Sequence, residues 1–572
     1  VISMFVSFTL TPALCSVWLR PMDARHRTSK SRGFYALLDR SYGAMLGWSL
    51  RHRPSIVLIA FGVVASAAVL FPSVAKELVP DDDQSEYSVN IRLPQGTSFW
   101  RTDEYARPIE EGLRKQPEVQ TVFTTVNAGS ANFYVGLTPL EDRDISQQEL
   151  IRRARAYVNR FTGARISVSG GTDISGTSTS SAGGRRGGPG MGTNRVQLQI
   201  QGPELQQLQT YATELLNRIR TIPGIVDANS NFEESSPELR VRIDRTRAAD
   251  LGVSIDSLAS NLRLLVGGDE VSKYKEGDDQ FSVKLRLDEQ FRNDPARMGE
   301  LLVPGAGGRP VKVGEIATLT LEPGPANIDR YNRQRQVSLM AGLDGIPLQS
   351  AIDAIQKKVD EMNLKPGYAV VFGGSARMLS QASGDFVMAV TLAVIFIYMV
   401  LASQFNSFIH PLTIMTAIPL SLPCGLFSLM LFGMTVNVYS AIGLMMLFGI
   451  VKKNSILQVD YTNTLVAQGM ERNEAIVAAN HVRLRPILMT TIAIVAGMLP
   501  IALGRGAGSL SRASMAVTII GGQLFCLLLT LLVTPVIYSL FDDAKLRLRR
   551  LLGAARRAET APEAPPAEET AG

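Results

Sequence analysis

Apolar runs and polar stretches alternate along the chain, and the longest apolar runs predict membrane-spanning helices. A helix needs about 20 mostly apolar residues to cross a bilayer. Runs of that kind lie near 1–19, 54–73, 383–403, 408–433, 437–461, 486–505 and 513–541. The polar stretch between the second and third runs predicts a large water-facing domain. We therefore expect a helical membrane bundle joined to a folded domain outside the bilayer.

A strand–helix–strand pattern repeats within this polar stretch. Its copies are predicted at 87–93, 102–116 and 119–126, at 195–201, 204–221 and 224–232, and at 335–342, 348–363 and 367–373, with a further helix and strand at 148–160 and 164–169. Repeated β-α-β units of this length typically form split βαβ (ferredoxin-like) sandwiches, in which helices cover one sheet face. Residues 236–322 form an insertion between the second and third copies. The pattern predicts an α+β domain.

Charge indicates which side of the membrane each part faces. The net charge is +6, and Lys and Arg cluster beside the apolar runs, within 20–53 and 545–550. Such clusters favour the cytoplasmic side, so they place residues 74–380 on the opposite side and do not indicate nucleic-acid binding. Residues 557–572 are rich in Ala, Pro and Glu and predict disorder. The Gly/Ser-rich segment 170–194 is either a flexible flap or disordered.

Composition argues against several classes of protein. The three cysteines, Cys15, Cys424 and Cys526, all lie in apolar segments, and the chain has only four histidines. We therefore expect neither a disulfide framework nor a metal site. The sequence contains no nucleophile elbow and no phosphate-binding glycine loop, so we expect no enzyme, no ATP-driven transport and no cofactor. The opening run, 1–19, lacks a charged leader, and we expect the chain to be the C-terminal part of a longer protein.

Lys453 is the strongest candidate for functional chemistry. It lies inside the 437–461 run and is followed by Asn454. A cation at bilayer depth costs a few kcal/mol, so it usually lines a pathway or pairs with an acid. The alternative is that Lys453 snorkels to the cytoplasmic surface. That alternative suits its neighbour Lys452 better, because the two side chains point about 100° apart on a helix.

Arg483 and Thr490 extend this candidate site. They lie seven residues apart on either side of Pro486, which is expected at a helix start, and so they share one helix face. Our hypothesis joins both to Lys453 in one polar network, whereas the alternative makes Arg483 a cytoplasmic anchor. Asp460 is about 10 Å from Lys453 by helix rise. We therefore expect the counter-charge of Lys453 on a helix upstream of this chain.

Several motifs together resemble one family of transporters. They are Leu10–Cys15, Glu77–Gln84, Ile243–Val253, Tyr398–Pro411, Gly449–Leu457 and Arg483–Thr491. On these motifs, nearly the whole chain resembles the C-terminal half of a resistance–nodulation–division (RND) efflux transporter. The branch it resembles is the hydrophobe/amphiphile exporters, the acriflavine-resistance type of inner-membrane pump. The last two motifs are the most specific.

The resemblance implies a function and a set of partners. It implies a multi-pass protein of the Gram-negative inner membrane, with a large periplasmic domain, that expels amphipathic drugs, dyes and detergents in exchange for protons. It also implies a homotrimer that works with the N-terminal half of the same protein, a periplasmic adaptor, an outer-membrane channel and membrane lipids. Lys453, Arg483 and Thr490 match the family's proton-relay positions, with Asn454 beside them. Their partners would be two adjacent aspartates on the fourth span of the full protein.

The resemblance also divides the chain into parts. These are the end of a sixth span (1–19), a cytoplasmic linker with an amphipathic helix (20–53), a span (54–76), a first porter subdomain (77–192), a second porter subdomain (193–235 and 325–375), a docking subdomain (236–324), a five-helix bundle (383–541) and a basic, then disordered tail (542–572). Phe123 and Tyr134 match positions that line the substrate pocket, although Phe123 could instead pack in a sheet core. Between them, 124–133 is shorter than the family's switch loop.

Two other functions stay open at this point. The chain could export lipids, signalling molecules or peptides rather than drugs. From a different class, it could be a non-transporting scaffold or a sterol-sensing-type receptor with the same fold. A scaffold or receptor would have no need of Lys453.

Overall fold

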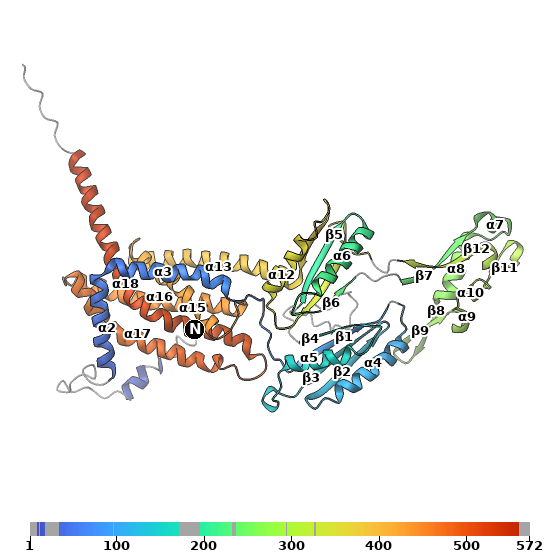
Figure 1. The fold of residues 1–572 in the computed structure, drawn as a ribbon, viewed down its shortest axis with the longest axis horizontal. Helices are drawn as coiled ribbons and strands as arrows, with labels where there is room; N and C mark the ends of the chain where they lie inside the picture. Colours follow the sequence, from blue (N-terminus) through green and yellow to red (C-terminus); the bar gives the residue numbers. More distant parts are fainter. Residues whose placement is uncertain are drawn as a thin grey trace, which may run out of the picture. The chain divides into compact units, whose positions relative to one another are not determined.

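The computed structural model describes residues 9–10, 12–17, 34–94, 96–170, 195–231, 236–292, 294–324 and 328–559. The chain divides into two compact units, a helical unit of residues 1–82 with 379–572 and an α+β unit of residues 83–378 (Figure 1). Three predicted segments lie partly outside the described residues: the flap at 170–194, the linker at 20–53 and the tail at 542–572.

Apolar helices build the helical unit. They are α2 (Phe34–Arg51), α3 (Arg53–Ser73), α13 (Gly374–Phe405, which begins in the other unit), α14 (His410–Met415), α15 (Ala417–Leu431), α16 (Val438–Ala467), α17 (Arg472–Ala502) and α18 (Ser509–Glu559). Within the described ranges, six helices are long and apolar enough to cross a membrane, with α14 and α15 counted together. All six overlap predicted runs, and the run at 1–19 is helical at 9–10 and 12–17.

Helix boundaries differ from the prediction at three places. The run at 408–433 is divided at Thr416, the N-cap of α15. Pro486 lies inside α17, which begins at Arg472, so the prediction that Pro486 starts a helix was wrong. Neighbouring helices in a bundle compensate for the backbone hydrogen bond that a proline removes, and this overrides its preference for helix starts. α18 also continues to Glu559, into the stretch predicted to be disordered.

Glycines let α15, α16 and α18 approach one another closely. A Cβ atom at Gly521 of α18 would lie 1.9 Å from Oγ of Ser428 on α15. A Cβ atom at Gly443 of α16 would lie 2.8 Å from the backbone oxygen of Met515 on α18. A helix backbone yields less readily than a side chain, so the contact at Gly443 requires a residue without a Cβ atom.

We expect Gly443→Ala to destabilise the helical unit by roughly 1–3 kcal/mol, because the added methyl group overpacks the α16–α18 contact. Gly449→Ala on the same helix is the matched control, since a Cβ atom there meets nothing within 4 Å. The control should be neutral or slightly stabilising. Thermal unfolding of both variants in detergent measures the difference. Equal melting temperatures would show that α18 shifts away at no cost.

The first sheet of the α+β unit has the strand order β2-β3-β1-β4, with antiparallel neighbours. Its elements are β1 (Glu86–Arg92), α4 (Phe99–Arg114), β2 (Val119–Asn127), β3 (Ser130–Leu137), η2 (Leu140–Asp142), α5 (Gln147–Val158) and β4 (Arg165–Gly170). Alternate strand residues such as Val89, Phe133 and Val135 are fully buried with Ile109 of α4 and Leu150 of α5. The two helices therefore cover one face of the sheet.

The second sheet repeats these elements later in the chain. It contains β5 (Arg195–Gly202), α6 (Leu205–Ile219), β6 (Ile225–Ser230), β13 (Arg330–Tyr331), β14 (Gln334–Leu343), α12 (Leu348–Asp360) and β15 (Ala369–Gly373). The strand order is β13-β14-β5-β15, and β6 pairs with β14. These elements lie on the predicted second and third copies of the repeat, so strands from both copies share one sheet.

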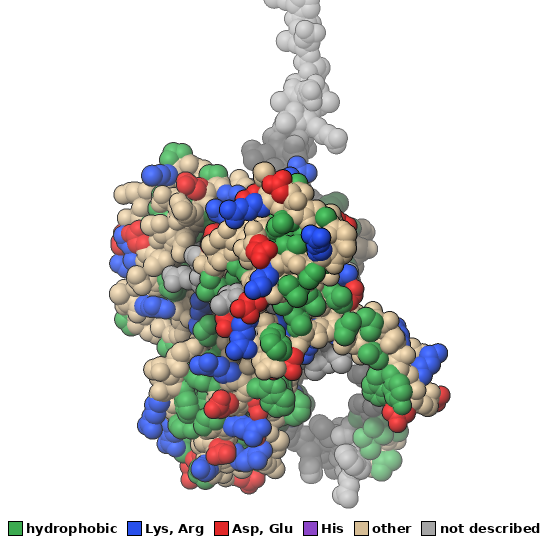
Figure 2. Space-filling view, turned by 90° about the vertical axis from the view of Figure 1, so that its right-hand side faces the viewer, with side chains coloured by type: hydrophobic (Ala, Val, Ile, Leu, Met, Phe, Trp, Pro, Cys, Tyr) green, Lys and Arg blue, Asp and Glu red, His purple; other side chains and the backbone are tan. Residues whose placement is uncertain are grey.

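The insertion lies in the sequence between the second and third copies of the repeat, which together build the second sheet. It consists of β7 (Ser236–Ile243), α7 (Arg245–Asp250), α8 (Ile255–Leu262), η3 (Arg263–Gly267), β8 (Asp269–Glu276), β9 (Asp279–Leu285), α9 (Glu289–Arg292), α10 (Pro295–Met298), β10 (Leu302–Pro304), η4 (Ala306–Gly308), β11 (Pro310–Lys312), α11 (Val313–Ile316) and β12 (Ala317–Gly324). Pairing of β7 with β12 brings its two ends together. On the face drawn in Figure 2, charged side chains of both signs mix with hydrophobic ones, which is typical of water-facing surfaces.

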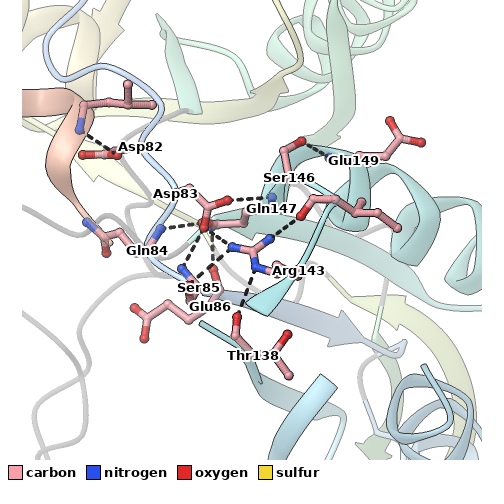
Figure 3. Close-up of polar contacts among 12 residues, drawn as sticks. Asp82, Asp83, Gln84, Ser85, Glu86, Thr138, Arg143, Ser146, Gln147 and Glu149 are labelled. Atoms are coloured by element: carbon pink, nitrogen blue, oxygen red, sulfur yellow. Dashed lines mark hydrogen bonds and ion pairs between the residues drawn. The ribbon is translucent and has the colours of Figure 1, made fainter. Parts of the chain in front are cut away.

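A buried ion pair anchors the start of the first sheet (Figure 3). The guanidinium of Arg143 is 1% exposed and binds the carboxylate of Asp83. Arg143 also donates to the carbonyl oxygens of Thr138, at 3.1 Å, and Ile145, at 2.7 Å. The second carboxylate oxygen of Asp83 accepts from the backbone N–H of Gln147 at 2.9 Å. Each of the three guanidinium nitrogens of Arg143 therefore donates at least one hydrogen bond.

Candidate functional site

α16 presents a buried face and an open face. Asn437 caps the helix: its side chain accepts from the backbone N–H of Ser440 at 3.0 Å, and the hydroxyl of Ser440 accepts from the N–H of Asn437 at 2.8 Å. Beyond the cap, Leu444, Leu447 and Val451 are buried in the bundle core. From its start to Lys453, the exposed residues of the helix are Val438, Ile442, Met445, Met446, Gly449 and Lys453, which recur on one side of it. Lys453 therefore belongs to an apolar stripe that nothing else in the described chain covers.

No acidic partner for Lys453 lies within the described residues. Its ammonium group makes no hydrogen bond or ion pair there. Asp460 on the same helix is exposed. Asp542 and Asp543 of α18 both bind Arg472, at 3.3 and 2.5 Å. The position of the expected counter-charge thus stays a prediction about helices beyond this part of the chain.

Asn454 points about 100° away from Lys453 on α16, toward the buried side of the helix. It is 2% exposed, and its Nδ2 atom has no hydrogen-bond partner among the described residues. The next residue, Ser455, shares a hydrogen bond of 3.0 Å with Thr534 of α18. Consecutive residues therefore place a cation on the open face and an amide in the polar interior of the bundle.

The structure does not join Arg483 and Thr490 directly to Lys453. The guanidinium of Arg483 lies 4.6 Å from the ring centroid of Tyr461, two turns beyond Lys453 on α16. The hydroxyl of Thr490 donates to the carbonyl oxygen of Ile487 in its own helix, at 3.0 Å. Arg483 therefore contacts the helix that carries Lys453, while Thr490 is bonded locally. A single network of the three residues stays a prediction.

Phe123 and Tyr134 are brought together by a hairpin that sequence reasoning missed. β2 and β3 are joined by a tight turn in which Gly129 has φ of +77°, and Phe123 lies directly opposite Tyr134. The two side chains are 66% and 43% exposed, so Phe123 does not pack in a sheet core. Segment 124–133 is strand, turn and strand. The turn residues Asn127 to Ser130 between alternating runs were the signal for this hairpin.

Glu77 is a largely buried carboxyl, just beyond α3, that the sequence did not reveal as a titrating group. Its backbone N–H donates to the carbonyl oxygen of Val436 at 3.1 Å, and its carboxylate accepts from the hydroxyl of Thr435. Burial raises the pKa of Glu77 to about 7; the Thr435 bond opposes the rise and the charge of Asp81 adds to it. A carboxyl with this pKa exchanges its proton near neutral pH.

Glu77 should make the stability of the helical unit depend on pH. Its pKa is 4.5 in an ordinary setting and about 7 in the fold. Below a pH of 4.5 the carboxyl is protonated in both the folded and the unfolded chain, and the contribution of Glu77 to the free energy of unfolding is fully present. This contribution is lost as the pH rises through about 7, the pKa in the folded chain. We expect about 2–3 kcal/mol of unfolding free energy to be lost from this group between about pH 4 and pH 8. Thermal unfolding of the chain in detergent across this range measures the loss.

The variant Glu77→Gln keeps an acceptor for the Thr435 hydroxyl but cannot ionise. We expect its pH dependence to be flatter than that of the wild type over the same window. Glu474→Gln removes an exposed carboxylate from α17 and serves as the control. If Glu77→Gln and wild type lose stability in parallel as pH rises, the carboxyl of Glu77 does not carry the titration.

Comparison with known proteins identifies the family. Residues 1–542 match the model of the AcrB/AcrD/AcrF family. Multidrug resistance protein MdtC of Pectobacterium carotovorum subsp. carotovorum (strain PC1) is 30% identical over 556 residues, covering 95% of this chain and 53% of MdtC. The protein of the same name from Klebsiella pneumoniae (strain 342) is 29% identical over 559 residues, covering 96% and 53%.

Solved structures show the same fold. A heavy metal efflux pump in crystal form II superposes with a TM-score of 0.77 at 24% identity, covering 94% of this chain and 54% of the pump. Crystal form I gives 0.74 at 23% identity, covering 88% and 51%. The chain spans about half the length of the curated relatives it matches. It belongs to the AcrB/AcrD/AcrF family of RND efflux transporters, which are multi-pass inner-membrane proteins and not enzymes.

Proposed function

We propose that this chain is the C-terminal half of a proton-driven exporter of amphipathic small molecules. The observation that carries the proposal is the placement of Lys453. It stands on an apolar, open stripe of a candidate span, without a counter-charge in the described residues. A cation left in that position in a bilayer is costly. A second half that covers the stripe and brings carboxylates to Lys453 removes this cost.

The proposed mechanism is an electrostatic switch. Deprotonated carboxylates on the covering helices hold Lys453, and their protonation releases it. In a medium of low dielectric constant, this change biases two helix arrangements by a few kcal/mol. The charge of the released Lys453 would be relayed or stabilised by Arg483, Asn454 and Thr490. The shift would travel along α13, a continuous helix from Gly374 to Phe405, into the second sheet, because β15 ends where α13 begins.

The assembly and the finer fold belong to the same proposal. We propose a homotrimer that passes substrate to a periplasmic adaptor and an outer-membrane channel, with the α+β unit in the periplasm. The name of MdtC, a multidrug resistance protein, supports drugs as substrates. We propose that the sheets are split βαβ porter subdomains. Support comes from the first sheet's order, β2-β3-β1-β4, which a β-α-β-β-α-β chain gives when its two β-α-β halves interleave.

Transport by the assembled protein tests the proposal. The chain is coexpressed with an N-terminal half from the same protein, and everted membrane vesicles are incubated with a fluorescent amphipathic dye. Dye should accumulate when an inward-acid gradient is imposed, and a protonophore should abolish accumulation. Dye accumulation that persists in the presence of the protonophore would refute proton coupling. Transfer of labelled lipid without uptake of dye would instead identify a lipid exporter. If the vesicles show neither activity, the alternative of a scaffold or receptor is favoured.

A further inference from the structure

The segment that follows α3 pairs with the segment that precedes α16. The backbone N–H of Val436 donates to the carbonyl oxygen of Ala75 at 2.8 Å, and the N–H of Glu77 donates back to the carbonyl oxygen of Val436 at 3.1 Å. A parallel β-bridge lies between these two bonds. Residues 75–78 and 435–438 therefore join the end of one candidate span to the start of another.

Side-chain hydrogen bonds continue from this pairing into the bundle. The hydroxyl of Thr435 donates to the carboxylate of Glu77, and Nδ2 of Asn437 donates to the same hydroxyl at 3.2 Å. Oδ1 of Asn437 accepts from the N–H of Ser440 at 3.0 Å, and the hydroxyl of Ser514 on α18 lies 3.2 Å from that oxygen. Glu77 is thus two hydrogen bonds away from the residue that caps α16.

The surroundings of Glu77 favour its protonated form. Burial raises its pKa to about 7, the bond from Thr435 opposes the rise, and the charge of Asp81 adds to it. Lys76, the neighbouring cation, lies over the ring of Phe71 at 4.1 Å. The other charged or titratable side chains of 74–82 and of the facing helix starts, none of which bonds to Glu77 in the described chain, are Asp82, Tyr439 and Arg512. A buried carboxylate without a cation is costly, so ionisation of Glu77 favours its exposure to water.

We propose that Glu77 is a proton-operated latch, which fastens the end of α3 to the capped start of α16 when protonated and loosens this connection when ionised. Separation of 75–78 from 435–438 exposes the carboxylate to water and removes the cost of its burial. The same separation takes away the Thr435 hydroxyl that Asn437 binds. The inference goes beyond the proposed function, because Lys453 lies about 24 Å further along α16 by helix rise.

The two pKa values of Glu77 set the direction of the effect. The pKa is about 7 in the closed latch and 4.5 in an ordinary setting. Because the closed latch holds the proton more tightly, low pH favours closure. Opening becomes more frequent as the pH rises from 4.5 to about 7, and it levels off above that value. Between about pH 5 and pH 8, we expect the open population to rise at least about tenfold.

Hydrogen–deuterium exchange of the purified full chain in nanodiscs tests the latch. Exchange is read by mass spectrometry at about pH 5 and pH 8, and the rates are corrected for the intrinsic pH dependence of amide exchange. We expect protection of 75–78 and 435–440 to fall at least about tenfold at the higher pH. Protection of 444–451, in the core of α16, should stay the same. Glu77→Gln cannot ionise and should keep its protection at both pH values, whereas Glu474→Gln, an exposed control, should behave as the wild type.

Constant protection of the latch in the wild type would overturn the inference. So would a fall that persists in Glu77→Gln, or an equal fall in 444–451, because the whole helix would then be opening. Thr435→Val is a second variant, for the case that Glu77→Gln does not fold. It removes the partner of the ionised carboxylate and should enlarge the fall, so an unchanged fall would also contradict the proposal. No transport is measured, so loss of the latch and loss of the proposed export are separate results.

Discussion

Lys453→Met is expected to reduce proton-coupled transport by the assembled protein to background. The variant keeps the length and apolar stem of the side chain but removes the charge that carboxylates would hold and release. We expect a fall of at least about 100-fold in the initial rate, corresponding to about 3 kcal/mol or more of lost coupling. The everted-vesicle assay measures it, with dye uptake under an imposed proton gradient. Expression and assembly should match the wild type.

Lys452→Met is the matched control. Lys452 precedes Lys453 on α16 but points about 100° away and is only partly exposed. We expect this variant to keep most of its transport. A second measurement uses the chain alone: Lys453 has no partner to lose there, so Lys453→Met should not lower its melting temperature. Normal transport by Lys453→Met would rule out Lys453 as the switch, and equal loss in both variants would point to a general effect of charge.

The membrane helices could be predicted because the bilayer fixes the length and composition of any segment that crosses it. α3, α13 and α16 carry that requirement in their own residues, so no knowledge of their neighbours was needed. The strand–helix–strand copies could be predicted for a similar reason, since burial of one face imposes a local period. The family resemblance rested on motifs such as Gly449–Leu457, which the match over residues 1–542 confirmed.

Features set by distant contacts could not be predicted. Glu77 titrates near neutral pH because the folded chain buries it, beside Thr435, which lies 358 residues away and whose hydrogen bond opposes the rise in pKa. The helix start expected at Pro486 was wrong because bundle packing outweighs a local preference. Phe123 is exposed because the helices cover the other face of β2. That face could not be predicted, because the prediction missed β3, the strand that pairs with β2. In each case the deciding group lies in another element.

Asp83→Ala is expected to lower the free energy of unfolding of the α+β unit by about 3–5 kcal/mol. The variant removes the carboxylate from a guanidinium whose side chain is only 1% exposed, and an unpaired buried charge carries a penalty of that size. It also leaves the backbone N–H of Gln147 without its acceptor. Denaturant unfolding of the full chain, followed by tryptophan fluorescence and circular dichroism, measures the loss. Glu110→Ala, which breaks an exposed pair with Arg114, should change little.

A double-mutant cycle separates the ion pair from its surroundings. Replacing both Asp83 and Arg143, the latter by Met, removes the buried charge altogether, so the double variant should be more stable than Asp83→Ala alone. The ion pair between Asp83 and Arg143 also lies where the chain passes from one unit to the other. Asp82, the preceding residue, accepts hydrogen bonds from the backbone of Leu510 and Ser511 in α18 at 3.2 and 3.0 Å. The chain passes from the helical unit to the α+β unit between these two aspartates, so each unit holds one end of the connecting peptide bond. A double variant no more stable than Asp83→Ala would mean that Asp83 acts through the backbone of Gln147 and not through the charge of Arg143.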